Sequence, residues 1–177
     1  MQADQSFQLT WVQHLDSKWG SAANGGVRYY VLDNEPSIWH ETHRDIHPNG
    51  SGMEEVRDKM LVYSGMIKTQ DPTAYVIGPE EFGWSGYWLS GIDLKYGGET
   101  GDWSNLPDKK AHGGADYLPW VLQQLKSHEG ILSRPFALYM RPPRLGMQGH
   151  LRLNDATSRI RARTMQAGPF RQSTTSW

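Results

Sequence analysis

The stretch that decides the fold is "VRYYVLDNEPSIWHETHRDIHP", which runs from Val27 to Pro48. Its first six residues, Val27 to Leu32, are mostly aliphatic or aromatic and predict a short buried strand. Asp-Asn-Glu-Pro follows directly, so Glu35 stands where that strand ends. Catalytic residues of α/β barrels gather at this edge, where a partly buried carboxylic acid can protonate a leaving oxygen. Glu35 is therefore a candidate general acid, and the alternative is that it only caps the loop.

Outside this stretch the hydrophobic period alternates between that of a helix and that of a strand. Apolar residues recur at every fourth position from Phe7 to Trp19, and Ser51 with Glu54 has the spacing of a helical capping box. The predicted elements are a helix over 7–19, a strand over 27–32, a helix over 51–70, a strand over 73–78, a helix over 117–130 and a strand over 136–140. This alternation is typical of parallel βαβ units.

Composition excludes several classes of protein. The 177 residues are 37% hydrophobic with a net charge of -1, which is typical of one soluble globular domain. The absence of cysteine excludes disulfides and thiolate metal sites. No segment approaches the roughly 18 consecutive apolar residues of a membrane helix, so no membrane partner is expected. The 8 Trp and 8 Tyr outnumber the 4 Phe, and such amphipathic rings suit sugar faces.

Two stretches interrupt the alternation. Residues 80–116 are rich in Gly, Trp, Tyr and Asp without a period, which predicts a long functional loop. Residues 141–177 contain seven Arg, no Lys and one acid, Asp155, and form a basic C-terminal tail without a predicted structure. Because the tail lacks interleaved aromatic residues and a recognisable module, no nucleic-acid partner is expected. We therefore divide the chain into a domain over 1–140 and this tail.

Further candidate site residues lie in the loops after the predicted strands. Asn34 can donate to a sugar hydroxyl near the reacting carbon. Glu80 and Glu81 follow the strand over 73–78, and either could serve as a second carboxylate. Aromatic residues in these loops favour sugar stacking over core packing; they are Trp39, Trp84, Tyr87 and Trp88.

Three histidines share one loop, His40, His43 and His47. His43 and His47 have the i, i+4 spacing that binds zinc on a helix, but no glutamate-flanked zincin pattern accompanies them. Hydrogen bonds within the loop or contacts to sugar are favoured over metal binding. The sequence also lacks a phosphate-binding glycine loop, so neither a metal nor a cofactor is predicted.

The opening stretch, together with "IKTQDPTAYVIGPEEFGWSGYW" and "DYLPWVLQQLKSHE", resembles glycoside hydrolase family 44, the bacterial endoglucanases and xyloglucanases. The likeness covers roughly residues 7–139 and implies a (β/α)₈ barrel with an added β-sandwich, in which 27–32 is the fourth barrel strand. It also implies a retaining mechanism with Glu35 as the general acid/base and Asn34 in contact with the sugar at the cleavage point.

A complete barrel takes about 250 residues. We therefore expect an incomplete (β/α)₈ TIM barrel over 1–140, about strands four to six with their helices, whose nucleophile, remaining strands and β-sandwich lie outside this chain. The expected function is that of an endo-acting β-1,4-glucan hydrolase on cellulose or xyloglucan, secreted as the full-length protein and inactive as this fragment. The alternatives are a non-catalytic polysaccharide-binding module and a barrel glycosidase acting on mannan or xylan.

Overall fold

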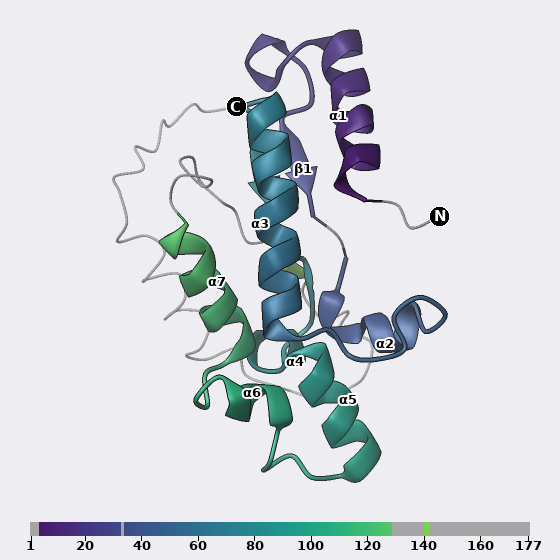
Figure 1. The fold of residues 1–177 in the computed structure, drawn as a ribbon, viewed down its shortest axis with the longest axis vertical. Coiled ribbons are helices and arrows are strands. Elements are labelled where there is room, and N and C mark those ends of the chain that lie inside the picture. The colour runs from purple at the N-terminus through teal and green to yellow at the C-terminus, as the bar shows by residue number, and fades with distance from the viewer. Residues whose placement is uncertain (1–3, 33, 129–139, 142–177) are drawn as a thin grey trace, which may run out of the picture. The chain divides into compact units, whose positions relative to one another are not determined.

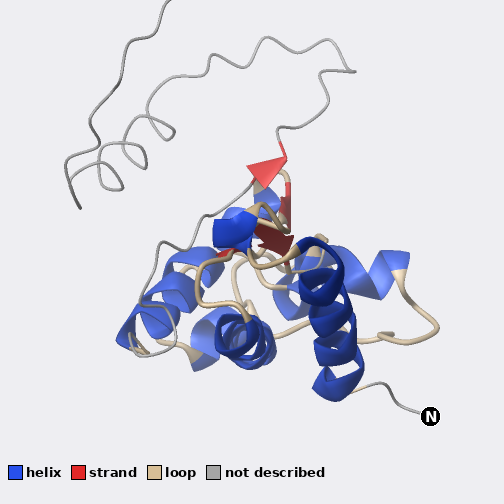
Figure 2. Ribbon diagram, turned by 90° about the horizontal axis from the view of Figure 1, so that it is seen from above, coloured by secondary structure: helices blue, strands red, loops and turns tan. Residues whose placement is uncertain are grey.

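The computed structural model describes residues 4–32, 34–128 and 140–141. Its helices and strands are α1 (Gln5–Trp19), the 3-10 helix η1 (Ala22–Asn24), β1 (Tyr29–Val31), the 3-10 helix η2 (Pro36–Ile38), α2 (Trp39–Thr42), α3 (Met53–Gln70), β2 (Tyr75–Ile77), β3 (Glu81–Phe82), α4 (Ser85–Trp88), α5 (Gly91–Thr100), α6 (Pro107–Ala111), α7 (Tyr117–Ser127) and β4 (Met140–Arg141) (Figure 1). Figure 2 shows how short the strands are beside the helices. Within the described ranges, no helix has both the length and the apolar character needed to cross a bilayer.

The strands pair as the sequence predicts. β1 and β2 are parallel, with Tyr30 opposite Val76, and the long helix α3 connects them. This is the expected βαβ unit. β3 and β4 form a second parallel pair, with Glu81 opposite Met140. Positions 136–139 of the strand predicted over 136–140 lie outside the described residues, as does nearly all of the basic tail.

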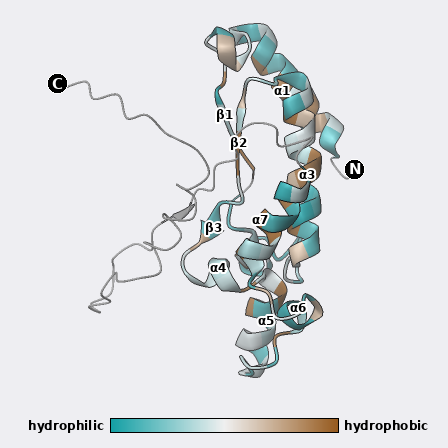
Figure 3. Cartoon of the chain, turned by 90° about the vertical axis from the view of Figure 1, so that its left-hand side faces the viewer, coloured by the Kyte–Doolittle hydropathy of each residue, from teal (hydrophilic) through white to brown (hydrophobic). Residues whose placement is uncertain are grey.

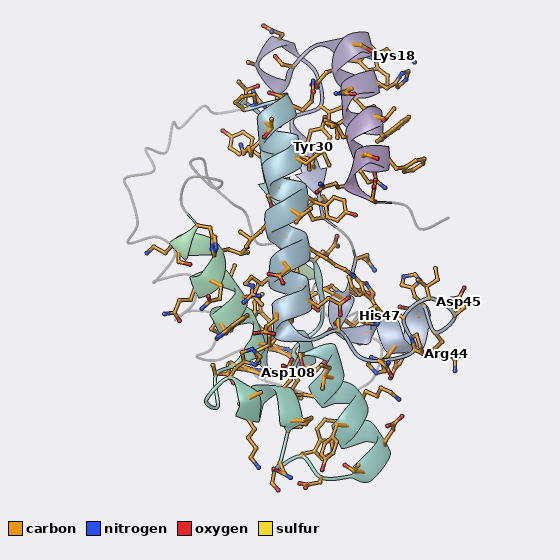
Figure 4. The ribbon with its side chains drawn as sticks, in the orientation of Figure 1. Lys18, Tyr30, Arg44, Asp45, His47 and Asp108 are labelled. Atoms are coloured by element: carbon orange, nitrogen blue, oxygen red, sulfur yellow. The ribbon has the colours of Figure 1, made fainter. Side chains whose placement is uncertain are left out.

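The two faces of β1 have different surroundings. Tyr30 packs toward α1 and α3, against a core that contains Val12, Ile67 and Val76, and Figure 4 shows it between the two helices. On the opposite face, Tyr29 is 58% exposed and Val31 is 52% exposed. The helices therefore cover one face of the strand pair and leave the other apolar face open in the described part of the chain. In Figure 3, β2 is coloured as hydrophobic, whereas α3 has mixed hydropathy.

A second core joins α3 to α7. Its buried residues lie at helical spacing along both helices and are Met53, Val56, Met60, Tyr117, Leu118, Val121 and Leu125. The helices predicted over 51–70 and 117–130 are confirmed as α3 and α7, and positions 129–130 of the second prediction lie outside the described residues. Because α3 contributes to both cores, it fixes β1 and β2 on one side and α7 on the other.

The helix over 7–19 is also confirmed, but its packing face differs from the aromatic stripe in the sequence. Phe7, Trp11 and Trp19 are exposed, whereas Val12 is buried against the core that α3 shares. The spacing of apolar residues predicts a helix but does not determine which of its faces packs against another element. The neighbour that the described chain provides, α3, meets the side that carries Val12.

The prediction of a capping box at the start of α3 was wrong. The Ser51 hydroxyl donates to the Pro36 carbonyl at 2.6 Å, and the residue that precedes the helix is Gly52. The amide of Met53 donates instead to Oδ2 of Asp108 at 2.9 Å, and Figure 4 shows Asp108 at this end of α3. A residue far away in the sequence thus satisfies an orphan amide that a local side chain was expected to satisfy.

The prediction of one long loop over 80–116 was also wrong, because this stretch contains β3, α4, α5 and α6. Asp93, on α5, accepts hydrogen bonds from the amides of Asp108 at 2.8 Å and Lys109 at 3.0 Å. Asp93 is fully buried, and this burial raises its pKa, opposed by the two amides. Helices this short lack a visible period, and buried side-chain caps hold them together.

Candidate active site

Glu35 lies beyond the carboxyl end of β1, beside the segment that follows β2. Its amide donates to the Glu80 carbonyl at 2.6 Å, and Asn34 pairs with Glu80 in a parallel bridge. The parallel pairing therefore brings Glu35, Glu80 and Glu81 to one edge. All three acids are candidates from the sequence, and the paired strand ends place them close together.

The backbone of Glu35 is left-handed, with φ 54° and ψ 55°, and its side chain is only 8% exposed. A non-glycine residue in this conformation costs about 1–3 kcal/mol and persists where its surroundings impose it, as they often do at functional sites. The surroundings here are specific. Ile38 donates its amide to the Glu35 carbonyl at 3.0 Å, and the Trp39 indole donates to the Asn34 carbonyl at 3.0 Å.

Glu81 has no exposed surface and lies among η2, α4 and α7. The Tyr117 hydroxyl donates to its Oε1 at 2.5 Å, and the Ser37 amide donates to its Oε2 at 3.4 Å. Burial raises the pKa of Glu81 to about 7, and hydrogen bonds from Tyr117 and Ser37 oppose that rise. The carboxyl group is therefore an interior group of the described chain, connected to the turn that carries Glu35.

Trp39 is buried beneath this turn. Its ring lies 4.6 Å from the Lys59 ammonium and 5.4 Å from the His47 ring. His47 and Lys59 both bind Glu55, at 2.9 Å and 2.6 Å, and Figure 4 shows His47 near the start of α3. Burial raises the pKa of Glu55, but the hydrogen bonds from Lys59 and His47 outweigh it and hold that pKa below its ordinary value. A sugar contact of Trp39 stays a prediction, and its observed contacts anchor Asn34.

The three other predicted aromatic residues form a row at α4. The centroids of Trp84 and Tyr87 are 5.6 Å apart, and those of Tyr87 and Trp88 are 6.1 Å apart. Trp84 is 42% exposed and Trp88 is 40% exposed. At Gly86, between them, an added β-carbon would lie 2.9 Å from Oε2 of Glu81. The backbone of α4 at Gly86 therefore packs against the buried acid, and the indole rings of Trp84 and Trp88 are partly exposed on the same short helix.

The predicted histidine loop does not form a helix through His43 and His47, because α2 ends at Thr42. His40 is buried, and this burial lowers its pKa. His47 binds Glu55, so a hydrogen-bonding role applies to it. Across residues 4–32, 34–128 and 140–141, no three His, Asp or Glu side chains are placed to hold a metal ion.

A cavity of about 530 Å³ lies between α1, β1 and α3. Its lining is mostly apolar and includes Trp11, Val12, Tyr30, Trp39 and Lys59, but not Glu35. It lies beside α1 and α3, and Glu35 does not belong to its lining. Ser37 and Tyr117 were not among the residues predicted for the site. They belong to it through their hydrogen bonds to the buried Glu81, which lies 36 positions from Tyr117 in the sequence.

Comparison with known proteins agrees with the motifs. The family model for glycoside hydrolase family 44 matches residues 1–133. The β-mannanase/endoglucanase A of Caldicellulosiruptor saccharolyticus is 33% identical over 116 residues, which cover 65% of this chain and 8% of that protein. The endoglucanase A of Paenibacillus lautus is 38% identical over 77 residues, 43% of this chain and 11% of that protein. The chain thus spans a small part of either relative.

Solved structures show the same relation. CelM2, a bifunctional glucanase-xylanase from a metagenome library, is 56% identical with a TM-score of 0.74, over 79% of this chain and 28% of its own. A family 44 xyloglucanase from Paenibacillus polymyxa, solved with xyloglucan, is 28% identical with a TM-score of 0.58, over 75% of this chain and 25% of its own. The chain therefore spans about a quarter of each of these structures.

Proposed function

The chain belongs to glycoside hydrolase family 44, and on that premise we propose that it carries the general acid/base of a retaining endo-β-1,4-glucanase, with Glu35 in that role. The observation that carries the proposal is the position of Glu35. It follows a parallel strand at its carboxyl end, is mostly buried, and has a left-handed backbone imposed by its neighbours. We propose cellulose or xyloglucan as the substrate, in line with the family 44 xyloglucanase solved with xyloglucan.

The proposed chemistry has two steps. In the first, the Glu35 carboxylic acid gives its proton to the glycosidic oxygen while a nucleophilic carboxylate bonds to the sugar carbon and the leaving sugar departs. In the second, the Glu35 carboxylate takes a proton from water, and that water's oxygen displaces the nucleophile. The Asn34 side chain contacts the sugar at the cleavage point. The nucleophile belongs to a part of the barrel outside this chain.

We further propose that β1 is the fourth barrel strand, β2 and β3 the fifth, and β4 the sixth. The open apolar face with Tyr29 and Val31 supports this assignment, because the remaining strands and the barrel interior would cover it. Hydrolysis then requires the rest of the barrel, and the family likeness adds a β-sandwich. Since the polysaccharide substrate is extracellular, we propose that the complete protein is secreted.

The experiment is a chimera in which residues 1–133 replace the matching segment of CelM2, which is 56% identical. Glu35→Gln should lower kcat/KM on β-glucan by at least about a hundredfold, the scale of general acid catalysis. An activated aryl cellobioside should lose much less, because its leaving group departs with little protonation. The control is Glu41→Gln, whose side chain is 70% exposed in the same segment.

Two results would contradict the proposal. One is a folded, unaltered chimera with no glucanase activity, and the other is a Glu35→Gln variant that loses equal activity on both substrates. Xylan and mannan are assayed beside glucan, because CelM2 is a glucanase-xylanase and the Caldicellulosiruptor protein a β-mannanase/endoglucanase. Activity on either one in place of glucan would change the proposed substrate and keep the proposed role of Glu35.

The exposed rings of Trp84 and Trp88 favour a second candidate function, a non-catalytic polysaccharide-binding module. Such a module would bind soluble glucan through these rings without any release of reducing ends by the chimera. Affinity electrophoresis in glucan-containing gels, run beside the activity assay, separates the two functions.

A further inference from the structure

The buried acid Glu81 is connected to the turn around Glu35 by its backbone and by its side chain. The carbonyl of its neighbour Glu80 accepts the Glu35 amide at 2.6 Å. Its own Oε2 accepts the Ser37 amide at 3.4 Å, two residues beyond Glu35. The chain on both sides of the left-handed residue is therefore held by one short segment, Glu80–Glu81.

The other side of the Glu81 carboxyl group is fixed as well. Tyr117, the first residue of α7, is fully buried and donates its hydroxyl to Oε1 at 2.5 Å. α4 packs so closely that an added β-carbon at Gly86 would lie 2.9 Å from Oε2 and 3.3 Å from the Ser37 hydroxyl. Contacts from α4 and α7 thus prevent the carboxyl group from moving away from the turn.

A buried carboxyl group in this position is costly, since an apolar side chain would fill the same space without desolvation. The group is retained where two donors converge, the Tyr117 hydroxyl and the Ser37 amide. We propose that Glu81, held by Tyr117, is a positioning residue that fixes the backbone of the turn and so aims Glu35 at the glycosidic oxygen. This inference rests on the proposed role of Glu35.

The test uses the same chimera and compares kcat/KM on β-glucan with kcat/KM on an activated aryl cellobioside. Glu81→Leu removes both acceptor atoms, so the turn relaxes and Glu35 is displaced. The glucan value should fall by about ten- to a hundredfold, the scale of a misplaced catalytic group, and the aryl value by much less. Glu81→Gln should recover most of the loss, because its amide oxygen accepts from Ser37 while its amino group donates to the Tyr117 oxygen.

Tyr117→Phe is the second variant, and it keeps the test decisive where Glu81→Leu does not fold. It leaves the Glu81–Ser37 contact but removes the hydrogen bond that holds the carboxyl group on the α7 side. The loss of kcat/KM should again be larger on β-glucan than on the aryl cellobioside, but smaller than the loss in Glu81→Leu. The matched control is Asp93→Leu, which exchanges another fully buried carboxyl group, one that binds α6 and not the turn. It should lower the melting temperature and affect both substrates equally.

The outcomes separate the two proposals. The positioning role is refuted if Glu35→Gln lowers kcat/KM more on β-glucan than on the aryl cellobioside while Glu81→Leu and Tyr117→Phe lower both values equally. The role of Glu35 stands in that case. If Glu35→Gln lowers kcat/KM equally on both substrates, the proposed function fails and the inference fails with it. Recovery by Glu81→Gln together with a proportional effect of Asp93→Leu supports the inference, because loss of packing alone would lower both rates in step.

Discussion

The buried position of Glu81 predicts that stability depends on pH, and the sign follows from its pKa. Burial raises that pKa from 4.5 to about 7. Between these pH values the folded protein keeps the proton on Glu81 while the unfolded chain has lost it. The stabilisation by the protonated group is therefore fully present below about pH 4.5 and is lost as the pH rises through 7.

The magnitude follows from the same two values. A rise from 4.5 to about 7 corresponds to about 3 kcal/mol, at about 1.36 kcal/mol for each pH unit. Since 1 kcal/mol shifts the melting temperature by about 2–4 °C in domains of 150–250 residues and by less in a longer chain such as the chimera, the melting temperature should fall by only a few degrees between pH 5 and pH 8. Glu81→Gln removes the titrating group, so the unaltered chimera should lose stability relative to this variant over that range.

The measurement is the melting temperature of both proteins at intervals from pH 5 to pH 8, by calorimetry. The difference between the two melting temperatures reports on Glu81, because His40 and Asp93 are present in both proteins. The lowered pKa of His40 makes stability rise with pH, and the raised pKa of Asp93 makes it fall, as the raised pKa of Glu81 does. A difference that stays constant from pH 5 to pH 8, or that favours the unaltered chimera as the pH rises, would refute this reasoning.

Two further predictions concern the aromatic row and the chain alone. Changing Trp84 or Trp88 to Ala in the chimera should weaken binding of β-glucan oligosaccharides by about 1–3 kcal/mol in titration calorimetry, with little change in melting temperature; a large loss of stability with unchanged affinity would assign these rings to packing. The isolated 177 residues should be oligomeric or aggregated in size exclusion and should release no reducing sugar from β-glucan, since one apolar strand face stays open. A cooperatively melting monomer that cleaves glucan would show that no further strands are needed.

Much of the fold and the first candidate site residue follow from local sequence. The run of aliphatic and aromatic residues in 27–32 predicts a strand, and the helical spacing of apolar residues along 53–70 predicts a helix. Both signals are local, because each side chain's face is set by the backbone period of its own element. Glu35 was a candidate for the same local reason, since it follows a strand directly. The aromatic residues Trp84, Tyr87 and Trp88 were candidates from residue type and position after a strand.

Tertiary contacts decided the rest. The orphan amide at the start of α3 is satisfied by Asp108, 55 positions later, and not by the nearby Ser51. Phe7, Trp11 and Trp19 of the α1 stripe are exposed, because α3 meets an adjacent side of the helix, which carries Val12. Glu81 changes from a candidate at the strand edge into a buried group because α7 brings Tyr117 to it across 36 positions. Periodicity and local motifs describe a single element, whereas burial, capping and pKa depend on which distant element packs against it.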